Sequence, residues 1–288
     1  MGYVDDAFEK MRKAAEITDG EQQLASRRHQ RIRAVVEDLW DIDTTFLTGS
    51  YKRHTKTKPL ADVDIFVVVK SDGAQGHYRN GPPGVILDDL CGDLDGKFLH
   101  VYVDGMAVVI EMSDDDGQAS FELVPAYEHS RSGYEIPDPG RGRWIRTDPS
   151  VHADLTSKKN SECDEKWVPF VKMLKSWNRV AGDPISPSFL VEVMALGLVK
   201  TPFGRYQDEM ATVLGNIIDG ADGPWRDPAG LGPDVDDQMS AHDRATVRTA
   251  ATEALAIAEE AIYLEDEGRE RAAVEKWREL FGERMPRP

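Results

Sequence analysis

The sequence predicts an α+β protein in which a half built on a mixed β-sheet is followed by a helical half. Three observations support this class. The first 40 residues contain no proline and carry apolar side chains at helical spacing. Residues 44–127 hold short β-branched or aromatic runs bounded by Gly, Asp and Pro. Helical spacing then returns after residue 157.

The N-terminal segment is expected to form one or two long helices, because Ile32, Val35, Val36 and Leu39 recur at helical spacing. Five strands are expected after it, at 44–48, 62–69, 98–103, 107–112 and 119–124. A helix at 85–94 separates the second strand from the third. Residues 108–124 are expected to form a hairpin that turns through 113–117.

The second half begins after an irregular stretch. Residues 133–157 are rich in Pro and Gly and are interpreted as a connector. Helices are expected at 166–178 and 188–199. A further Gly, Pro and Asp-rich loop precedes a long helix that starts near Ser240, where Asp243 completes a capping box. A final amphipathic helix carries Val274, Trp277, Leu280 and Phe281.

Composition excludes several classes of protein. No unbroken apolar run exceeds five residues, so no membrane segment is expected, and without a secretory leader at the N-terminus a cytoplasmic location is expected. The formal charge of −17 repels long polyanions, so long nucleic acid is not an expected substrate. Two distant cysteines and the lack of an HExxH motif exclude a disulfide scaffold and a zinc hydrolase.

An aspartate pair opens the most hydrophobic predicted strand. Asp62 and Asp64 are two residues apart, so on a strand both project from one face while Val63 faces the other. Two like charges held about 6–7 Å apart repel each other unless a cation lies between them. Carboxylate oxygens suit magnesium, and paired magnesium ions assist in-line phosphoryl transfer. A solvated surface pair is the alternative, which the apolar strand disfavours.

A Gly-Ser turn and a third carboxylate complete the pattern. Gly49 allows close approach to a ligand, and Ser50 adds a hydroxyl donor for phosphate oxygens. Glu122, between Phe121 and Leu123, is the candidate third acid, with a solvent-facing strand residue as the alternative. Its rivals are Glu111 and the acidic run at 114–116. The basic residues from Lys52 to Lys58 are either a solvated loop or a countercharge for nucleotides beside the turn.

These motifs resemble those of a known superfamily. Gly49-Ser50, Thr55, Asp62-Val63-Asp64 and the later Phe-Glu-Leu-Val-Pro are similar to nucleotidyltransferases of the DNA polymerase beta type. More narrowly, the chain resembles the bacterial CD-NTases, cyclic-oligonucleotide synthases related to cyclic GMP–AMP synthase and oligoadenylate synthetase. The Lys-x-Trp-Asn helix adds to the resemblance, which covers most of the chain. Glu122 stands where the family usually has aspartate, which keeps the charge and lengthens the arm.

The resemblance implies an architecture and a site. It implies a two-lobed nucleotidyltransferase, with a mixed-sheet catalytic lobe and a helical lobe bridged by a long N-terminal helix. The expected divisions are 1–40 for the bridging segment, 41–150 for the catalytic core and 151–288 for the helical nucleotide-binding domain. Asp62, Asp64 and Glu122 would be catalytic and hold two Mg²⁺ ions, with Mn²⁺ as a substitute. The nucleotide-binding residues would be Gly49, Ser50, Lys175, Ser188 and Phe189.

Without the resemblance, Lys175 would be interpreted as a surface lysine at the edge of a buried helix stripe, and Phe189 as a core residue.

The implied reaction joins ribonucleoside triphosphates into a cyclic di- or trinucleotide and releases pyrophosphate, within anti-phage defence signalling. A regulatory protein partner and a separate effector are implied as well. Two alternatives stay open. One is a transferase that modifies a single acceptor, such as a drug, a protein or an RNA end, and the other is an inactive regulatory or antitoxin-like protein of the same fold.

Overall fold

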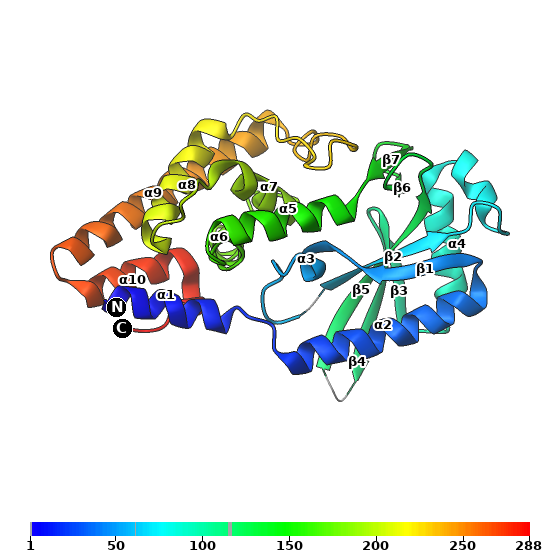
Figure 1. The fold of residues 1–288 in the computed structure, drawn as a ribbon, viewed down its shortest axis with the longest axis horizontal. Helices are drawn as coiled ribbons and strands as arrows, with labels where there is room; N and C mark the ends of the chain where they lie inside the picture. Colours follow the sequence, from blue (N-terminus) through cyan, green and yellow to red (C-terminus); the bar gives the residue numbers. More distant parts are fainter. Residues whose placement is uncertain (1, 61, 115–116) are drawn as a thin grey trace. The chain divides into compact units, whose positions relative to one another are not determined.

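The computed structural model describes residues 2–60, 62–114 and 117–288, which form two compact units (Figure 1). The sheet unit comprises Ile17–Ala153 and the short segment Ala229–Gly232. The helical unit comprises Met1–Glu16, Asp154–Pro228 and Pro233–Pro288. The expected α+β class, with a mixed sheet and a helical region, is confirmed.

The strands lie in about the first half of the described chain, and six helices follow them, which is the order of sheet and helices that the sequence predicted. The helices are α1 (Tyr3–Ala14), α2 (Asp19–Leu39), α3 (Gly49–Lys52), α4 (Pro83–Leu94), α5 (Pro149–Glu162), α6 (Trp167–Val180), α7 (Ser188–Leu198), α8 (Tyr206–Gly220), α9 (Ala241–Asp266) and α10 (Glu270–Phe281). Short 3₁₀ helices lie at Gly76–Asn80 and Gly282–Arg284. The strands are β1 (Ile42–Leu47), β2 (Asp62–Val69), β3 (His100–Asp104), β4 (Ala107–Asp114), β5 (Gly117–Glu128), β6 (Tyr134–Asp138) and β7 (Arg143–Thr147).

The N-terminal segment forms two helices, which the spacing of its apolar residues allowed, whereas the resemblance implied one long helix bridging the lobes. α1 ends at Ala14, and α2 begins after Thr18, which caps it. The Thr18 amide donates to Glu21 Oε2 at 2.9 Å, and the Glu21 amide donates to Thr18 Oγ1 at 3.3 Å. This capping box satisfies backbone donors that a continuous helix would pair internally, so the sequence itself starts a new helix here. α1 belongs to the helical unit and α2 to the sheet unit.

The sheet follows the order β1-β2-β5-β4-β3, and β6 pairs with both β5 and β7. β2 and β5 are parallel, whereas the other strand pairs are antiparallel. The five expected strands and the helix at 85–94 are confirmed, with ends shifted by up to four residues. The hairpin of β4 and β5 is confirmed too, although Asp115 and Asp116 of its expected turn lie outside the described residues.

The two faces of β2 have different roles because successive side chains alternate. Val63, Ile65 and Val67 are fully buried in a core that also contains Ile32 of α2 and Leu87 of α4. Those two helices cover this face of the sheet (Figure 1). The opposite face carries a smaller cluster around Phe66, Ala126 and Ile136. Asp62 and Asp64 precede Phe66 on that second face.

The expected irregular connector at 133–157 is wrong. β6 and β7 form a hairpin in which Ile136 opposes Ile145, closed by a turn between Pro139 and Gly142. The apolar runs are only two or three residues long, so the surrounding Pro and Gly dominated the pattern. α5 follows at once, because Asp148 Oδ1 accepts from the amides of Ser150 and Val151 and Pro149 occupies the first helical turn.

The helical unit has its own core. Phe8 of α1 packs edge-on against Trp277 and Phe281 of α10, with ring centroids 5.1 and 5.8 Å apart. The expected helices α6, α7, α9 and α10 are confirmed, and the Ser240–Asp243 capping box begins α9. α8 is an additional helix. No helix in the described part of the chain combines the length and apolar character that crossing a bilayer requires.

Candidate active site

Three carboxylates meet on one face of the sheet. In the parallel ladder of β2 and β5, Asp64 lies opposite Glu122, and Asp62 lies opposite Ser120. Neighbouring strands are about 4.8 Å apart, and residues paired across a ladder share a face. The structure therefore brings together Asp62, Asp64 and Glu122 although 58 residues separate Asp64 from Glu122 in the sequence.

Glu122 lies in surroundings that are unfavourable to its charged form. Its side chain is half-buried, like that of Asp64, whereas Asp62 is exposed. Burial, reinforced by the negative charges of Asp64 and then Asp62, raises the pKa of Glu122 to about 7. The positive charge of Lys56 lowers the pKa of Glu122 in part. Concentrated negative charge of this kind is the condition that a bound cation relieves.

A lysine and a serine hold Asp62. Lys56 Nζ lies 2.7 Å from Asp62 Oδ2, and the Ser120 hydroxyl donates to Asp62 Oδ1 at 3.0 Å. Lys56 belongs to the basic stretch that the sequence singled out. Within that stretch, Arg53 is also buried, and Lys58 Nζ lies 3.7 Å from Glu21 Oε2. The stretch is thus partly folded inward and is not a uniform solvated loop.

The Gly-Ser turn is pressed against the carboxylates. Gly49 has φ +60°, and a β-carbon built on it would lie 1.7 Å from Asp64 Oδ2. The Thr48 amide donates to the backbone carbonyl of Asp64 at 2.9 Å. The carbonyl of Ser50 accepts from the amides of Thr55 and Lys56, each at 3.0 Å. Glycine is required at position 49 by both conformation and space.

The rival third acids are placed elsewhere. Glu111 of β4 shares the face but pairs with Ser120, and its Oε1 accepts from the Tyr102 hydroxyl at 3.2 Å. It is therefore one strand farther from Asp62 than Ser120 is. Asp115 and Asp116 lie outside the described residues. Glu122 is the acid that stands directly beside Asp64.

The donor set fits magnesium in chemistry. Carboxylate and hydroxyl oxygens are the ligands that hard divalent cations prefer. Across residues 2–60, 62–114 and 117–288, no group of three His, Cys, Asp or Glu side chains is already arranged to hold a metal ion. The candidate oxygens lie on one face of the sheet, and those of Asp62 already contact Lys56 and Ser120.

The helical unit carries the other candidate residues. Lys175 of α6 is not the surface lysine that its helix position suggests, since its Nζ lies 2.7 Å from Glu192 Oε1 of α7. Glu192 is only 1% exposed. Ser188 is exposed in the first turn of α7, and Phe189 beside it is half-buried. Glu192 was missed by sequence reasoning, although a single acid within the apolar run of α7 was an available signal.

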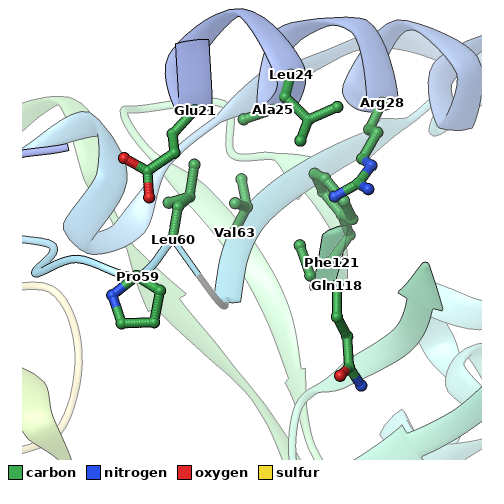
Figure 2. A pocket seen from close by; sticks show the side chains of 10 residues that line it. Glu21, Leu24, Ala25, Arg28, Pro59, Leu60, Val63, Gln118 and Phe121 are labelled. Carbon is green, nitrogen blue, oxygen red and sulfur yellow. The ribbon is translucent and has the colours of Figure 1, made fainter. Parts of the chain in front are cut away.

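A pocket lies on the reverse face of the same strands. Figure 2 shows its lining between α2 and the start of β2, with Val63 and Phe121 pointing into it. Its volume is about 120 Å³, and Glu21 and Arg28 are its charged lining residues. Because Val63 and Phe121 alternate with the acidic residues, this pocket contains none of the three carboxylates. It is separate from the candidate active site.

Comparison with known proteins gives consistent matches. Residues 1–160 match the Second Messenger Oligonucleotide or Dinucleotide Synthetase domain. A cyclic AMP-AMP-AMP synthase of Acinetobacter sp. is 27% identical over 262 residues, covering 84% of this chain and 73% of that protein. A probable cyclic nucleotide synthase of Bacillus cereus is 24% identical over 275 residues, covering 83% of this chain and 81% of that protein.

Solved structures share the fold. E. coli MS115-1 CdnC with ATP superposes with a TM-score of 0.74 at 15% identity, covering 97% of this chain and 98% of that one. The Bradyrhizobium diazoefficiens CD-NTase CdnG in complex with GTP gives 0.74 at 13% identity, covering 99% and 97%. The E. coli MS115-1 CdnC:HORMA-deltaN complex gives 0.73 at 15% identity, covering 96% of each chain.

The family match spans more than half of the chain, and the structural likeness spans nearly all of it. The expected resemblance is thereby confirmed. The chain belongs to the Second Messenger Oligonucleotide or Dinucleotide Synthetase family, the CD-NTases, which are nucleotidyltransferases that synthesise cyclic oligonucleotides.

Proposed function

We propose that this protein joins ribonucleoside triphosphates into a cyclic di- or trinucleotide and releases pyrophosphate, with Asp62, Asp64 and Glu122 as its catalytic residues. The observation that carries the assignment is the pairing of Asp64 with Glu122 across parallel strands, with Gly49 pressed against Asp64. The closeness of the Gly-Ser turn to the concentrated carboxylates supports a role of the turn in binding phosphate. The triphosphates named with the structural neighbours, ATP and GTP, are of the same substrate class.

Each group of candidate residues has its own role in the proposed reaction. The Gly49-Ser50 turn presents a hydroxyl and backbone N–H groups to the donor's phosphate oxygens. The acceptor ribose hydroxyl attacks the α-phosphorus, its proton passes to the Glu122 carboxylate, and the bond between the α-phosphorus and the bridging oxygen breaks. Pyrophosphate then leaves with the electron pair of that bond. Repeating the transfer within the linear product closes the ring.

The three carboxylates are the residues that would hold two Mg²⁺ ions, for which Mn²⁺ is a chemical substitute. When bound, these ions neutralise phosphate charge and lower the pKa of the attacking hydroxyl. The half-buried position of Glu122 supports this assignment, because uncompensated carboxylates are costly there.

The helical unit supplies the remaining nucleotide contacts in this proposal. Lys175 and Ser188 bind donor phosphates, and Phe189 stacks on a base. The Lys175–Glu192 pair supports a positioned lysine and disfavours a freely rotating one, because Glu192 is buried and fixes the Nζ atom. Lys175 acts in binding and takes no part in proton transfer.

By family likeness, the cyclic product serves as a second messenger in anti-phage defence in the bacterial cytoplasm, and a separate effector protein responds to it. A regulatory protein partner is part of the proposal, supported by the neighbour CdnC, whose complex with HORMA-deltaN has been solved.

The test is incubation with four labelled ribonucleoside triphosphates and magnesium, followed by phosphatase treatment and mass spectrometry. A phosphatase-resistant cyclic product with matching pyrophosphate release is the expected result. Labelling that requires an added acceptor would indicate single-acceptor transfer. Nucleotide binding without pyrophosphate release would indicate an inactive regulatory protein.

A further inference from the structure

Lys56 is a positive group in direct contact with Asp62, one of the candidate carboxylates. Its Nζ lies 2.7 Å from Asp62 Oδ2, and its side chain is only 14% exposed, compared with 52% for Asp62. The lysine therefore reaches its partner from the more buried side. An ammonium in this position supplies the charge that three neighbouring acids need.

The backbone of Lys56 is fixed independently of its side chain. Its amide donates to the carbonyl of Ser50 at 3.0 Å, as does the amide of fully buried Thr55. The side chain beyond this anchor has four rotatable bonds. The ammonium can therefore leave Asp62 without any movement of the Gly-Ser turn, and it stays within side-chain reach of that turn.

A divalent ion and this ammonium compete for the same carboxylate. The Ser120 hydroxyl is bound to Oδ1 of Asp62 and Lys56 to Oδ2. A metal ion on Asp62 would lie close to the ammonium and repel it, since both are positive. Metal ligation at Asp62 is therefore expected to displace the Lys56 ammonium by charge repulsion.

We propose that Lys56 is an exchangeable counter-ion of the active site, which holds Asp62 in place before a divalent ion arrives and is displaced when that ion binds. This inference rests on the proposed function, because it takes Asp62 as a metal ligand. It makes Lys56 a positioning residue and not a catalytic one. Once displaced, the ammonium is available to the phosphates that arrive at the Ser50 turn.

The experiment is a calorimetric titration of Mn²⁺ into the nucleotide-free full chain. Lys56→Met is compared with Lys52→Met, which removes an equal charge from an exposed position in α3. Lys56→Met is expected to bind Mn²⁺ about three- to tenfold more tightly than Lys52→Met, the range that loss of one modest ionic competitor gives. Lys56→Arg, which keeps the charge, is expected to bind as the parent does.

Thermal unfolding in EDTA gives a second measurement. Lys56→Met is expected to melt at a lower temperature than Lys52→Met without metal, and added Mn²⁺ should raise its melting temperature by more. Equal or weaker Mn²⁺ affinity of Lys56→Met relative to Lys52→Met overturns the inference.

Asp62→Asn separates the two proposals. If it abolishes Mn²⁺ binding while Lys56→Met matches Lys52→Met, the counter-ion role fails and the proposed metal site stands. If Asp62→Asn binds Mn²⁺ as the parent does, the metal site and the counter-ion role both fail.

Discussion

Gly49 and Asp64 are in contact with no space for another atom between them: a β-carbon on Gly49 would lie 1.7 Å from Asp64 Oδ2 and 2.3 Å from Cγ. This contact fixes the position of the Gly-Ser turn, which is proposed to bind phosphate, relative to the strand β2 that carries Asp62 and Asp64. Any side chain at position 49 has to displace the Asp64 carboxylate, because the backbone of Thr48 is also bonded to Asp64.

Gly49→Ala is therefore expected to reduce product formation by at least about a hundredfold, the scale of a misplaced reacting group. Gly105→Ala is the matched control. Gly105 has φ +55°, similar to that of Gly49, but a β-carbon there meets no heavy atom within 4 Å. Gly105→Ala should lose about 1 kcal/mol of unfolding free energy from backbone strain, and Gly49→Ala should lose more because Asp64 must also move, as measured by urea denaturation. Equal activity of the two variants would show that crowding at Asp64 is unimportant.

Asp62→Asn and Asp64→Asn should each reduce turnover by at least about a thousandfold, because each removes charge where the metal and triphosphate need it. Folding should survive, since the relief of carboxylate repulsion offsets the weakened contact between Asp62 and Lys56. Pyrophosphate release measures the first effect and thermal unfolding in EDTA the second. Near-normal release by the double variant would remove both residues from the site.

Glu122→Gln should abolish product formation while donor affinity stays within a few-fold of the parent, because the donor is bound mainly by Gly49, Ser50 and the helical unit. Glu122→Asp restores the family's usual residue and should keep measurable activity, reduced by roughly a hundredfold because the shorter arm misplaces the carboxylate by about an ångström. Labelled-product formation at saturating nucleotide and magnesium compares the two. If Glu122→Gln forms product at the parental rate, the third acid lies elsewhere, and Glu111 is the next residue to test.

Lys175→Met should weaken binding of a non-hydrolysable triphosphate and also lower stability by about 3–5 kcal/mol, since it removes the cation that contacts the buried Glu192 carboxylate. Adding Glu192→Gln removes the buried charge. The double variant should regain most of the stability but none of the triphosphate affinity. Calorimetric titration and urea unfolding give the two quantities. Full recovery of affinity in the double variant would reduce Lys175 to a structural residue.

The sheet unit should lose stability below pH 6.5 through His29. Its Nε2 lies 3.0 Å from Thr45 Oγ1, and burial lowers its pKa. The unfolded chain binds a proton near pH 6.5, which the folded chain resists, so unfolding free energy falls as pH drops below that value and levels off below the folded pKa. His29→Gln should show a smaller loss between pH 7.5 and 5.5 in urea unfolding than His100→Gln, whose histidine is exposed on β3.

The sequence predicted most of the sheet because its strands are strongly patterned. β2 was located at both ends from Asp62 to Val69, since a carboxylate pair opens an unbroken apolar run. β6 and β7 were missed because their apolar residues, such as Ile136 and Ile145, become informative only when paired. Short segments of this kind depend on long-range contacts that one-dimensional spacing does not contain.

The candidate site, too, could be predicted only in part from the sequence. Same-face projection of Asp62 and Asp64 follows from strand geometry alone. The partners of these groups do not, because Lys56 and Glu192 acquire their roles only through folding. A lysine six residues before an aspartate carries no signal of a salt bridge. Glu122 was already the preferred candidate from the sequence, and the register of β2 on β5 adds that it lies directly opposite Asp64.

The division of the N-terminal helices has a consequence for protein engineering. The chain leaves the helical unit after Glu16 and returns to it at Asp154, so the sheet unit is an insertion within a discontinuous domain. A fragment that starts at Asp154 lacks α1 and uncovers the aromatic surface of Trp277 and Phe281 that Phe8 covers. We expect such a fragment to aggregate, and we expect residues 1–16 to restore the missing helix when they are supplied as a separate peptide or fused to the C-terminus by circular permutation.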